Sequence, residues 1–517
     1  MFNTQKKSSK DLDPDRFFKT DHLLGDLKSR SVRGGAFTLT SQIFKFSTQT
    51  VSTLILARLL APDDFGLIGM VTALLVLADI FKEFGISSAI IQTPTINHAQ
   101  ASTLFWINAA ISITISLIIA SLAPVIASFY EEPRLEFIVI SLASVFMISG
   151  LAVQHQALLR RQMQFKLLAI AEIGASVVSM LSAIIAAFLG LGYWALIISR
   201  FIRATIFTVS TWLICSWRPG QPSKNAQIGS MLKFGANFTG FRFTNYFSRN
   251  LDNILIGKYL GSQALGIYVL AYRLLLLPIQ QINAPVASVA IPSLSMLQDK
   301  PIQYAKYYHY AILLITSVGM PIVSFLFVEV DNFVLLLMGE QWSESIIIFR
   351  LLAPAAFVQT FNVATGWIYM SLGRTDKQFK QSIVISTITI LCFIVGIQKG
   401  VTGIAATYGF ISPILMMGSL IYCYRGTNIK IIDFMKTISL PSISSAVSAF
   451  FLFLIKHVFL DNRPPLVSLT LSIFLYIVLY ISSWLLMSGK RYNIIQIFGF
   501  IKDILNKKKK RDKSQND

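Results

Sequence analysis

Fourteen apolar stretches of about twenty residues recur along the chain, and they constrain its fold more than any other feature. A helix needs roughly 20 apolar residues to cross the roughly 30 Å hydrocarbon layer of a bilayer. The polar segments between the stretches are too short to hold a soluble domain. We therefore predict an all-α integral membrane protein with spans near residues 36–58, 65–84, 102–123, 135–155, 167–189, 193–215, 232–257, 265–290, 308–328, 345–371, 379–397, 401–423, 438–459 and 466–488.

The composition agrees with a membrane protein and excludes a nucleic-acid binder. Hydrophobic residues make up 54% of the 517 residues and charged residues 14%, more apolar surface than a soluble domain could cover. The net charge is +20, but the basic residues lie between the apolar stretches, where they determine topology. We therefore expect a phospholipid bilayer around the chain and no nucleic acid bound to it.

The distribution of lysine and arginine predicts the orientation of the spans. Cytoplasmic loops carry the excess of these residues. Every basic cluster follows an even number of predicted spans, and the clusters are Lys28, Arg30 and Arg33; Arg160, Arg161 and Lys166; Arg218 and Lys224; Lys300 and Lys306; Arg374, Lys377 and Lys380; Arg425, Lys430 and Lys436; and Lys507 to Arg511. The opposite loops are poor in lysine and arginine, and several carry acidic residues, namely Asp63 and Asp64, Glu131 and Glu132, or Glu329, Asp331, Glu340 and Glu344. Both termini are therefore expected in the cytoplasm.

An ungapped repeat at an offset of 200 residues indicates a duplicated six-helix unit. Gly35 aligns with Gly235 and Gly66 with Gly266, with further matches between them. Because six spans is an even number, both copies enter from the same side, which predicts two pseudo-symmetric lobes with a site between them. The expected organisation is a cytoplasmic N-terminal segment, an N-lobe, a cytoplasmic loop, a C-lobe, two C-terminal spans and a basic tail, at residues 1–33, 34–217, 218–230, 231–425, 426–488 and 489–517.

Polar side chains follow one side of the seventh predicted span. Arg242, Asn245, Arg249, Asp252 and Asn253 recur at helical spacing, so they project to one face. An arginine at the bilayer centre costs roughly 2.5 kcal/mol or more if it faces lipid. The face is therefore expected to border a hydrophilic cavity.

The first span carries the same kind of stripe at the repeat offset. Gln42 aligns with Arg242, Lys45 with Asn245 and Gln49 with Arg249. Other polar residues at membrane depth extend the candidate cavity lining, and these are Arg200, Arg203, Arg273, Gln280, Asn283, Arg350, Gln359 and Asn362.

The charges at membrane depth are mostly positive, with Asp252 and Asp79 as acidic exceptions, and this balance favours an anionic cargo. Arginine matches the oxygens of phosphate groups especially well. Structural roles stay open: Arg249 and Asp252 are three residues apart and could neutralise each other, while Lys45, Arg203 and Arg350 could be structural or could extend toward the interface.

Catalytic and metal-binding patterns are absent from the sequence. Cys215, Cys392 and Cys423 have no CxxC spacing, and the five histidines have no metal-ligand spacing. The sequence shows no nucleophile elbow or phosphate-binding loop. We expect no enzyme activity, no cofactor and no bound metal.

Several motifs resemble one family of exporters. They are the string LARLLAPDDFGLIGM at 56–70, Phe84-Gly85, AIIQ at 89–92, FYEEP at 129–133, ALLRRQMQFK at 157–166, GYWAL at 192–196 and IGKYLGSQALGIYVLAYRLLLLP at 256–278. The chain up to about residue 430 resembles the Wzx-type polysaccharide flippases, in the branch that exports colanic and teichuronic acids.

The resemblance implies the fold of the multidrug, oligosaccharidyl-lipid and polysaccharide exporter superfamily, with two six-helix lobes around a central cavity and two extra helices. It also implies an undecaprenyl-diphosphate-linked oligosaccharide as cargo, alternating access, and a polysaccharide polymerase and export machinery as further partners in the bacterial inner membrane. Within the matching motifs, Arg242, Arg249, Asp252 and Arg273 are the candidates for substrate binding.

Two other functions fit parts of the pattern. A drug antiporter of the same superfamily would be expected to carry more membrane carboxylates and twelve spans. A membrane polymerase or ligase for the same glycans would be expected to have a large extracytoplasmic loop, whereas the outer loops here are short.

Overall fold

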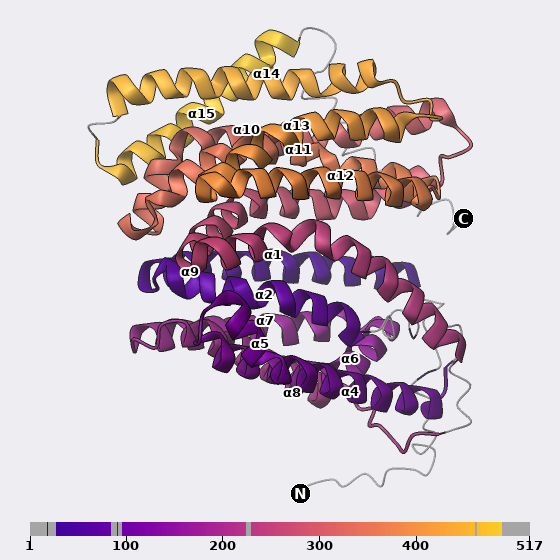
Figure 1. The fold of residues 1–517 in the computed structure, drawn as a ribbon. Helices are drawn as coiled ribbons and strands as arrows, with labels where there is room; N and C mark the ends of the chain where they lie inside the picture. Colours follow the sequence, from indigo (N-terminus) through magenta and orange to yellow (C-terminus); the bar gives the residue numbers. More distant parts are fainter. Residues whose placement is uncertain are drawn as a thin grey trace, which may run out of the picture. The chain divides into compact units, whose positions relative to one another are not determined.

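The structure is a computed structural model that describes residues 18, 27–83, 90, 96–223, 229–460 and 463–488. For some of these residues the structure describes the backbone but not the side chain, and they are 27–36, 38–39, 77, 80–83, 229–249, 288, 375 and 488. The described chain is helical and contains no strand. Its α-helices are α1 (Leu27–Leu59), α2 (Pro62–Glu83), α4 (His98–Ser121), α5 (Ala123–Tyr130), α6 (Leu135–Arg161), α7 (Phe165–Phe188), α8 (Trp194–Ile214), α9 (Gly229–Ser295), α10 (Pro301–Leu337), α11 (Glu344–Ser371), α12 (Thr375–Gly396), α13 (Gly400–Tyr424), α14 (Ile431–Ile455) and α15 (Pro465–Ser488) (Figure 1).

These helices confirm the prediction of an all-α membrane fold. Ten helical stretches of the described part are long and apolar enough to cross a membrane. One of them, Asp376–Tyr424, holds two of the predicted spans. The other predicted spans lie in α1, α2 and the first part of α9, and the polar stripe of α1 lowers the hydropathy of that helix.

Helix ends follow local sequence signals. α2 begins at Pro62 with Asp63 and Asp64 in its first turn, where a proline needs no hydrogen bond and acidic groups complement the helix dipole. α4 begins after a capping box in which Asn97 accepts from the backbone N–H of Gln100 at 2.8 Å. α9 consists of two helical parts that meet at Gly261, where a φ of 83° favours glycine. Each part corresponds to one of the predicted spans, near 232–257 and 265–290.

The chain divides into two compact units, Met1–Gly266 and Ile267–Asp517. In the first unit α6 packs against α2, α4, α5 and α8, and α7 packs against α1 and α8 (Figure 1). Small residues allow α4 and α6 to approach closely, because a Cβ at Gly150 would overlap Ser112, and Asn108 donates to the carbonyl of Gly150 at 2.9 Å. The expected domain boundaries stay a prediction.

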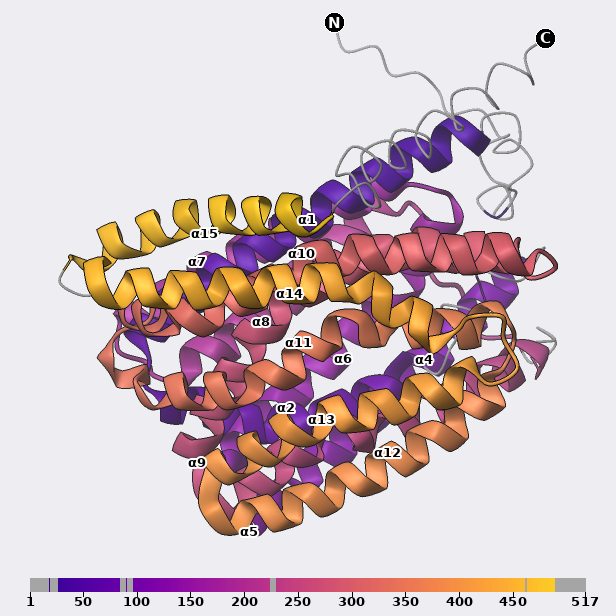
Figure 2. The same cartoon turned by 90° about the horizontal axis from the view of Figure 1, so that it is seen from above.

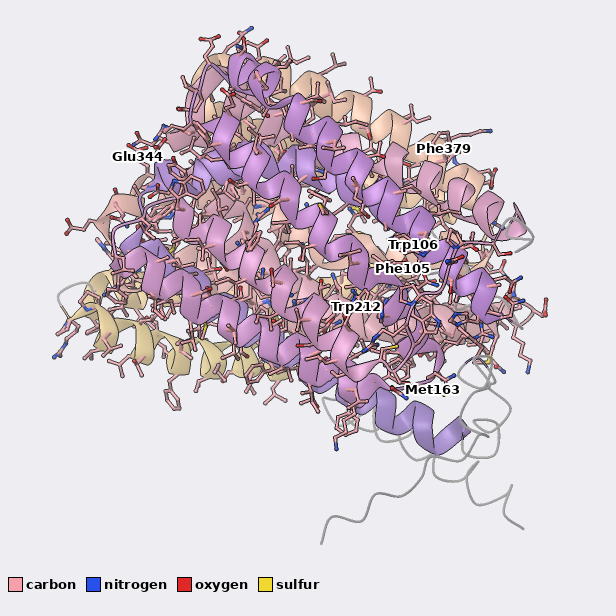
Figure 3. All side chains as sticks on the ribbon, turned by 90° about the horizontal axis from the view of Figure 1, so that it is seen from below. Phe105, Trp106, Met163, Trp212, Glu344 and Phe379 are labelled. Carbon is pink, nitrogen blue, oxygen red and sulfur yellow. The ribbon has the colours of Figure 1, made fainter. Side chains whose placement is uncertain are left out.

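One end of the first unit holds an aromatic cluster. The rings of Phe105 and Trp212 meet edge to face at 6.0 Å between centroids, and Trp106 lies beside Phe105 (Figure 3). Trp106 also donates to the carbonyl of Gly220 at 2.8 Å, and Ser102 accepts the backbone N–H of the same residue at 3.0 Å. These contacts fix the segment after α8 to the start of α4.

In the second unit α10 packs against α11, α14 and α15, and α13 packs against α11 and α12. Figure 2 shows α12 beside α13 and α14 beside α15. A Cβ at Gly409 of α13 would overlap the carbonyl of Leu351 in α11, so these backbones lie in close contact. A hydrogen bond between hydroxyl groups joins α14 and α15, with the Oγ atoms of Ser448 and Ser483 3.1 Å apart.

Candidate functional site

A polar pocket of about 380 Å³ lies inside the first unit, among α2, α6, α7 and α8. Its charged lining consists of Asp79, Arg160, Glu172, Arg200 and Arg203, which together define the polar pocket. The helices that carry these residues are otherwise mostly apolar. Three arginines therefore face two carboxylates within one pocket of a membrane protein.

Helix geometry brings the two arginines of α8 to the same wall. Arg200 and Arg203 are three residues apart, and residues at that spacing lie on the same helix face. Arg200 donates from Nη2 to the hydroxyl of Thr72 on α2 at 2.8 Å. This bond holds the Arg200 guanidinium against α2. Arg203 and Glu172 lie close enough to interact electrostatically. Both arginines are among the residues that the sequence predicts to line a cavity.

Lys45 of the predicted stripe lies close to the polar pocket. α1 packs against α7, and Lys45 lies within electrostatic range of Arg203 and Glu172. Its side chain is half-buried, whereas Gln42 and Gln49 are exposed on the protein surface. The lysine adds to the excess of positive charge around Glu172.

Three charged residues of the pocket are not among the predicted site residues. In the sequence, Arg160 is a topology signal, and Asp79 is only an acidic exception at membrane depth. The sequence argument misses Glu172, although a single carboxylate in an otherwise apolar span is a signal for a functional site. The pocket is therefore more nearly charge-balanced than the sequence predicted.

The seventh-span stripe is only partly described. The side chains of Arg242, Asn245 and Arg249 lie outside the described residues. Asp252 is buried and accepts the backbone N–H of Asn253, itself half-buried, at 2.8 Å. The role predicted for these five residues stays a prediction.

The remaining candidates lie in the second unit. Arg273 is half-buried and Gln280 is exposed, and both stay predictions as cavity residues. Arg350 forms an ion pair with Asp331 at 2.5 Å, which agrees with the structural role that the sequence left open. Gln359 donates to the hydroxyl of Tyr408 at 2.9 Å.

A charged network connects the start of α2, the loop after α5 and the first part of α9. Arg134 bonds Asp63 and Glu132, each at 2.7 Å. Ser262 donates to Asp63, and Lys258 pairs with Glu131 at 2.7 Å. The Arg134 guanidinium holds the pKa of Glu132 below its ordinary value.

An apolar groove of about 900 Å³ borders a different face of α2 from the polar pocket. Residues of α2, α4, α5 and α9 line it, and they are Leu74, Ala78, Ala110, Ile111, Thr114, Ile115, Ile118, Ile119, Leu122, Val125, Ile126, Phe129, Tyr130 and Ile254. Leu75 and Asp79, one position further along α2 than Leu74 and Ala78, line the polar pocket instead. The two pockets thus have opposite chemistry and share one helix.

No metal centre is found among the described residues, since they contain no group of three or more histidine, cysteine or acidic side chains that could hold an ion.

Solved structures share this fold. The structure "Lipid II flippase MurJ, inward closed conformation" aligns with a TM-score of 0.69 and 14% identity, over 88% of this chain and 99% of that chain. The MATE multidrug transporter DinF-BH aligns with a TM-score of 0.52 and 14% identity, over 77% and 96% of the two chains. At this identity the likeness shows a common fold.

Sequence relatives agree with the resemblance noted in the motifs. Lipopolysaccharide biosynthesis protein WzxC of Escherichia coli (strain K12) is 24% identical over 391 residues, which is 74% of this chain and 78% of that protein. Teichuronic acid biosynthesis protein TuaB of Bacillus subtilis (strain 168) is 28% identical over 353 residues, or 68% and 73%. The resemblance to Wzx-type flippases is thereby confirmed. Residues 55–347, more than half of the chain, match the family model described as polysaccharide biosynthesis protein, and the chain belongs to this family.

Proposed function

We propose that the protein translocates an undecaprenyl-diphosphate-linked oligosaccharide across the cytoplasmic membrane for the synthesis of a surface polysaccharide. The family, the relatives named for lipopolysaccharide and teichuronic acid synthesis, and the fold shared with a lipid II flippase support this function. The observation that carries it is the polar pocket within a membrane-spanning unit.

The chemistry of the pocket suits a diphosphate. Guanidinium groups bind phosphate oxygens through paired hydrogen bonds, and Arg160, Arg200 and Arg203 line the same space. Keeping Arg200 and Arg203 at membrane depth costs free energy, which a role in substrate binding explains. We assign first contact with the diphosphate to Arg200, Arg203 and Lys45.

The other predicted residues complete the proposal. Arg242, Arg249, Asp252 and Arg273 would bind the same head group at another stage of transport. Gln42, Gln49, Asn245, Asn253 and Gln280 would form the polar lining that the sugars contact. Gln42 and Gln49 on α1 align at the 200-residue offset with Arg242 and Arg249 on α9.

Transport requires no covalent chemistry. Alternating access needs only two conformations of the protein that expose the bound head group to opposite sides of the membrane and that bind it with different affinities. The protein would therefore be a transporter and not an enzyme. The isoprenoid tail would stay in the apolar phase while the head group crosses.

Orientation and partners are part of the proposal. The excess of lysine and arginine after even-numbered spans supports a multi-pass bacterial inner-membrane protein with both termini in the cytoplasm. The product would be released at the outer leaflet, where a polysaccharide polymerase and the export machinery would use it.

A drug antiporter is the second candidate, favoured by the two carboxylates of the polar pocket. Asp79 and Glu172 could exchange a proton or a cation during transport. A transport assay with an organic cation separates the candidates, because an antiporter would move the cation in the absence of any lipid-linked glycan.

The decisive experiment combines charge reversal with analysis of lipid-linked glycans. A strain that carries Arg200→Glu together with Arg203→Glu should accumulate repeat units of normal length in the inner leaflet and export no polysaccharide. Arg463→Glu, at an exposed position outside the pocket, is the matched control and should export normally. Normal export by the double variant at normal protein level would contradict the proposal, and exported but unpolymerised units would indicate a polymerase.

A further inference from the structure

Thr72 of α2 lies on the helix face that borders the polar pocket. It precedes Leu75 by three residues and Asp79 by seven, and residues at these spacings share one side of a helix. Leu75 and Asp79 both line the polar pocket. Thr72 is therefore placed at the edge of the pocket, one helical turn from its lining.

The hydroxyl group of Thr72 presents an acceptor, and not a donor, to the pocket. Its single proton is donated to the carbonyl of Ile68, four residues earlier in the same helix. Its oxygen accepts the bond from Nη2 of Arg200 at 2.8 Å. An oxygen that offers only lone pairs attracts a guanidinium and repels the oxygens of a phosphate. Thr72 can thus act on an anionic ligand only through Arg200.

The bond between Thr72 and Arg200 connects two walls of the pocket. Thr72 belongs to α2, which packs against α4 and α6, and Arg200 belongs to α8, which packs against α6 and α7. The polar pocket lies among α2, α6, α7 and α8. The long arginine side chain therefore reaches from one wall to an acceptor on another.

The acceptor is held more rigidly than the arginine. Thr72 is β-branched, and its bond to Ile68 selects one rotamer of the side chain. The backbone of α2 is also fixed near its start, where a Cβ at Gly66 would overlap the carbonyl of Ser262. An arginine side chain has several rotatable bonds, so its ordering costs conformational entropy. The bond to Thr72 orders Arg200 before any ligand arrives.

From these contacts we infer that Thr72 is a positioning residue of the polar pocket, which orients the guanidinium of Arg200 for the diphosphate without touching the substrate itself. The inference rests on the proposed function, in which Arg200 contacts the diphosphate. A guanidinium carries five N–H donors in a planar fork, more than one hydroxyl can engage. A single bond to Thr72 therefore sets the plane of the fork, and paired donation to phosphate oxygens depends on that plane.

Binding measurements on conservative variants test the inference. The purified full-length protein is placed in nanodiscs of phosphatidylethanolamine and phosphatidylglycerol, and its affinity for a fluorescent polyprenyl diphosphate is determined by titration. Thr72→Val keeps the shape of the side chain but removes the acceptor, and it should weaken binding about fivefold, because Arg200 must then be ordered during binding. Thr72→Ser keeps the hydroxyl group and should bind within about twofold of the unchanged protein.

A double-mutant cycle separates positioning from a general structural role. Arg200→Gln should weaken binding at least about tenfold, because a charge-assisted contact with phosphate is lost. In a chain that already carries Arg200→Gln, the further change Thr72→Val should have no effect, since Thr72 acts only through this arginine. A structural role would instead weaken binding by the same factor in both chains.

Thr208→Val is the matched control. Thr208 lies on α8 and also joins two helices, because its hydroxyl group donates to the carbonyl of Ile148 in α6 at 3.1 Å. It is buried and does not line the polar pocket. Its replacement removes an interhelical hydroxyl bond without changing an arginine, so the variant should bind like the unchanged protein.

Three results would overturn the inference: unchanged binding by Thr72→Val, an equal loss with and without Arg200, or an equal loss in Thr208→Val. Failure of the proposed function gives a different pattern. If Arg200→Gln itself binds like the unchanged protein, the assignment of the diphosphate to this arginine fails, and the inference fails with it. If Arg200→Gln is weakened and Thr72→Val is not, the inference fails alone.

Discussion

Gly66 of α2 lies so close to Ser262 of α9 that a Cβ at Gly66 would overlap the backbone carbonyl of Ser262. The reverse contact is also present, because a Cβ at Gly266 would overlap the carbonyl of Pro62. Both glycines and both partners are related by the 200-residue repeat of the sequence. Two helices that the sequence repeat relates thus cross at equivalent positions.

Replacement of Gly66 by alanine should open this crossing. The added methyl group meets backbone atoms that cannot rotate away, and overpacking of this kind costs about 1–3 kcal/mol. The expected result is a lower melting temperature of the detergent-solubilised protein. Gly174→Ala is the control, since its Cβ would meet nothing within 4 Å and alanine favours a helix. Equal melting temperatures for the two variants would show that the crossing is not tightly packed.

Glu172 should stabilise the positive charges around it. Its replacement by glutamine leaves Arg203 and Lys45 without the nearby negative charge, and because all three side chains are only half-buried we expect a loss of stability of about 1 kcal/mol. Arg203→Gln in the same chain should recover part of this loss. A double-mutant cycle on the denaturation free energy measures the coupling, and a coupling near zero would mean that the two groups act independently.

The fold could be predicted from the sequence, whereas the site could be predicted only in part. The number and position of the spans depend on apolar length, which is a local property. Each predicted span falls mainly on a helix, although several, such as 102–123 and 438–459, run past the end of that helix. The polar pocket depends on which faces of α2, α6, α7 and α8 meet, which the spacing of residues along one helix does not determine. Arg200 and Arg203 could be found as charges at membrane depth, but their proximity to Arg160 required the tertiary structure.

The sequence repeat predicted structural equivalence better at its glycine positions than at its polar positions. Gly66 and Gly266 occupy equivalent contacts, because close backbone approach tolerates no side chain. Polar side chains have more freedom, and residues at equivalent positions of the repeat need not share an environment. Asp252 is buried, whereas Ser52 at the matching position of α1 is half-buried.

The ion pair between Glu132 and Arg134 should make the stability depend on pH in the acidic range. Hydrogen bonding to Arg134 lowers the pKa of Glu132 from its ordinary value of 4.5. The stabilisation is therefore present above pH 4.5 and is lost as the pH falls through the lowered pKa. Because the arginine is 43% exposed, we expect at most about 1 kcal/mol. Melting temperatures measured between neutral and acidic pH should fall less steeply for Glu132→Gln, and parallel curves would contradict this role.

The buried pair of Glu329 and Lys456 should be the most sensitive contact of the second unit. Glu329, about two turns before the end of α10, is fully buried, lies 3.5 Å from the Nζ of Lys456, and accepts a hydrogen bond from the side-chain amide of Asn332 at 2.8 Å. Lys456 also donates to the carbonyl of Val328 at 3.1 Å from the π-helical turn Lys456–Leu460 that follows α14. Removing one partner of a buried pair leaves an uncompensated charge, which costs about 3–5 kcal/mol.

Glu329→Ala should therefore lower the denaturation free energy by that amount and loosen the contact of α14 with α10. The double replacement Glu329→Leu with Lys456→Met should be far less harmful, since a buried ion pair and an apolar pair of similar volume are often nearly equal in stability. Asp331→Asn is the control, because Asp331 is 36% exposed and its pairs with Lys456 at 3.8 Å and with Arg350 should each contribute at most about 1 kcal/mol. If Glu329→Ala is no less stable than Asp331→Asn, water reaches the pair and the charge at Lys456 is solvated.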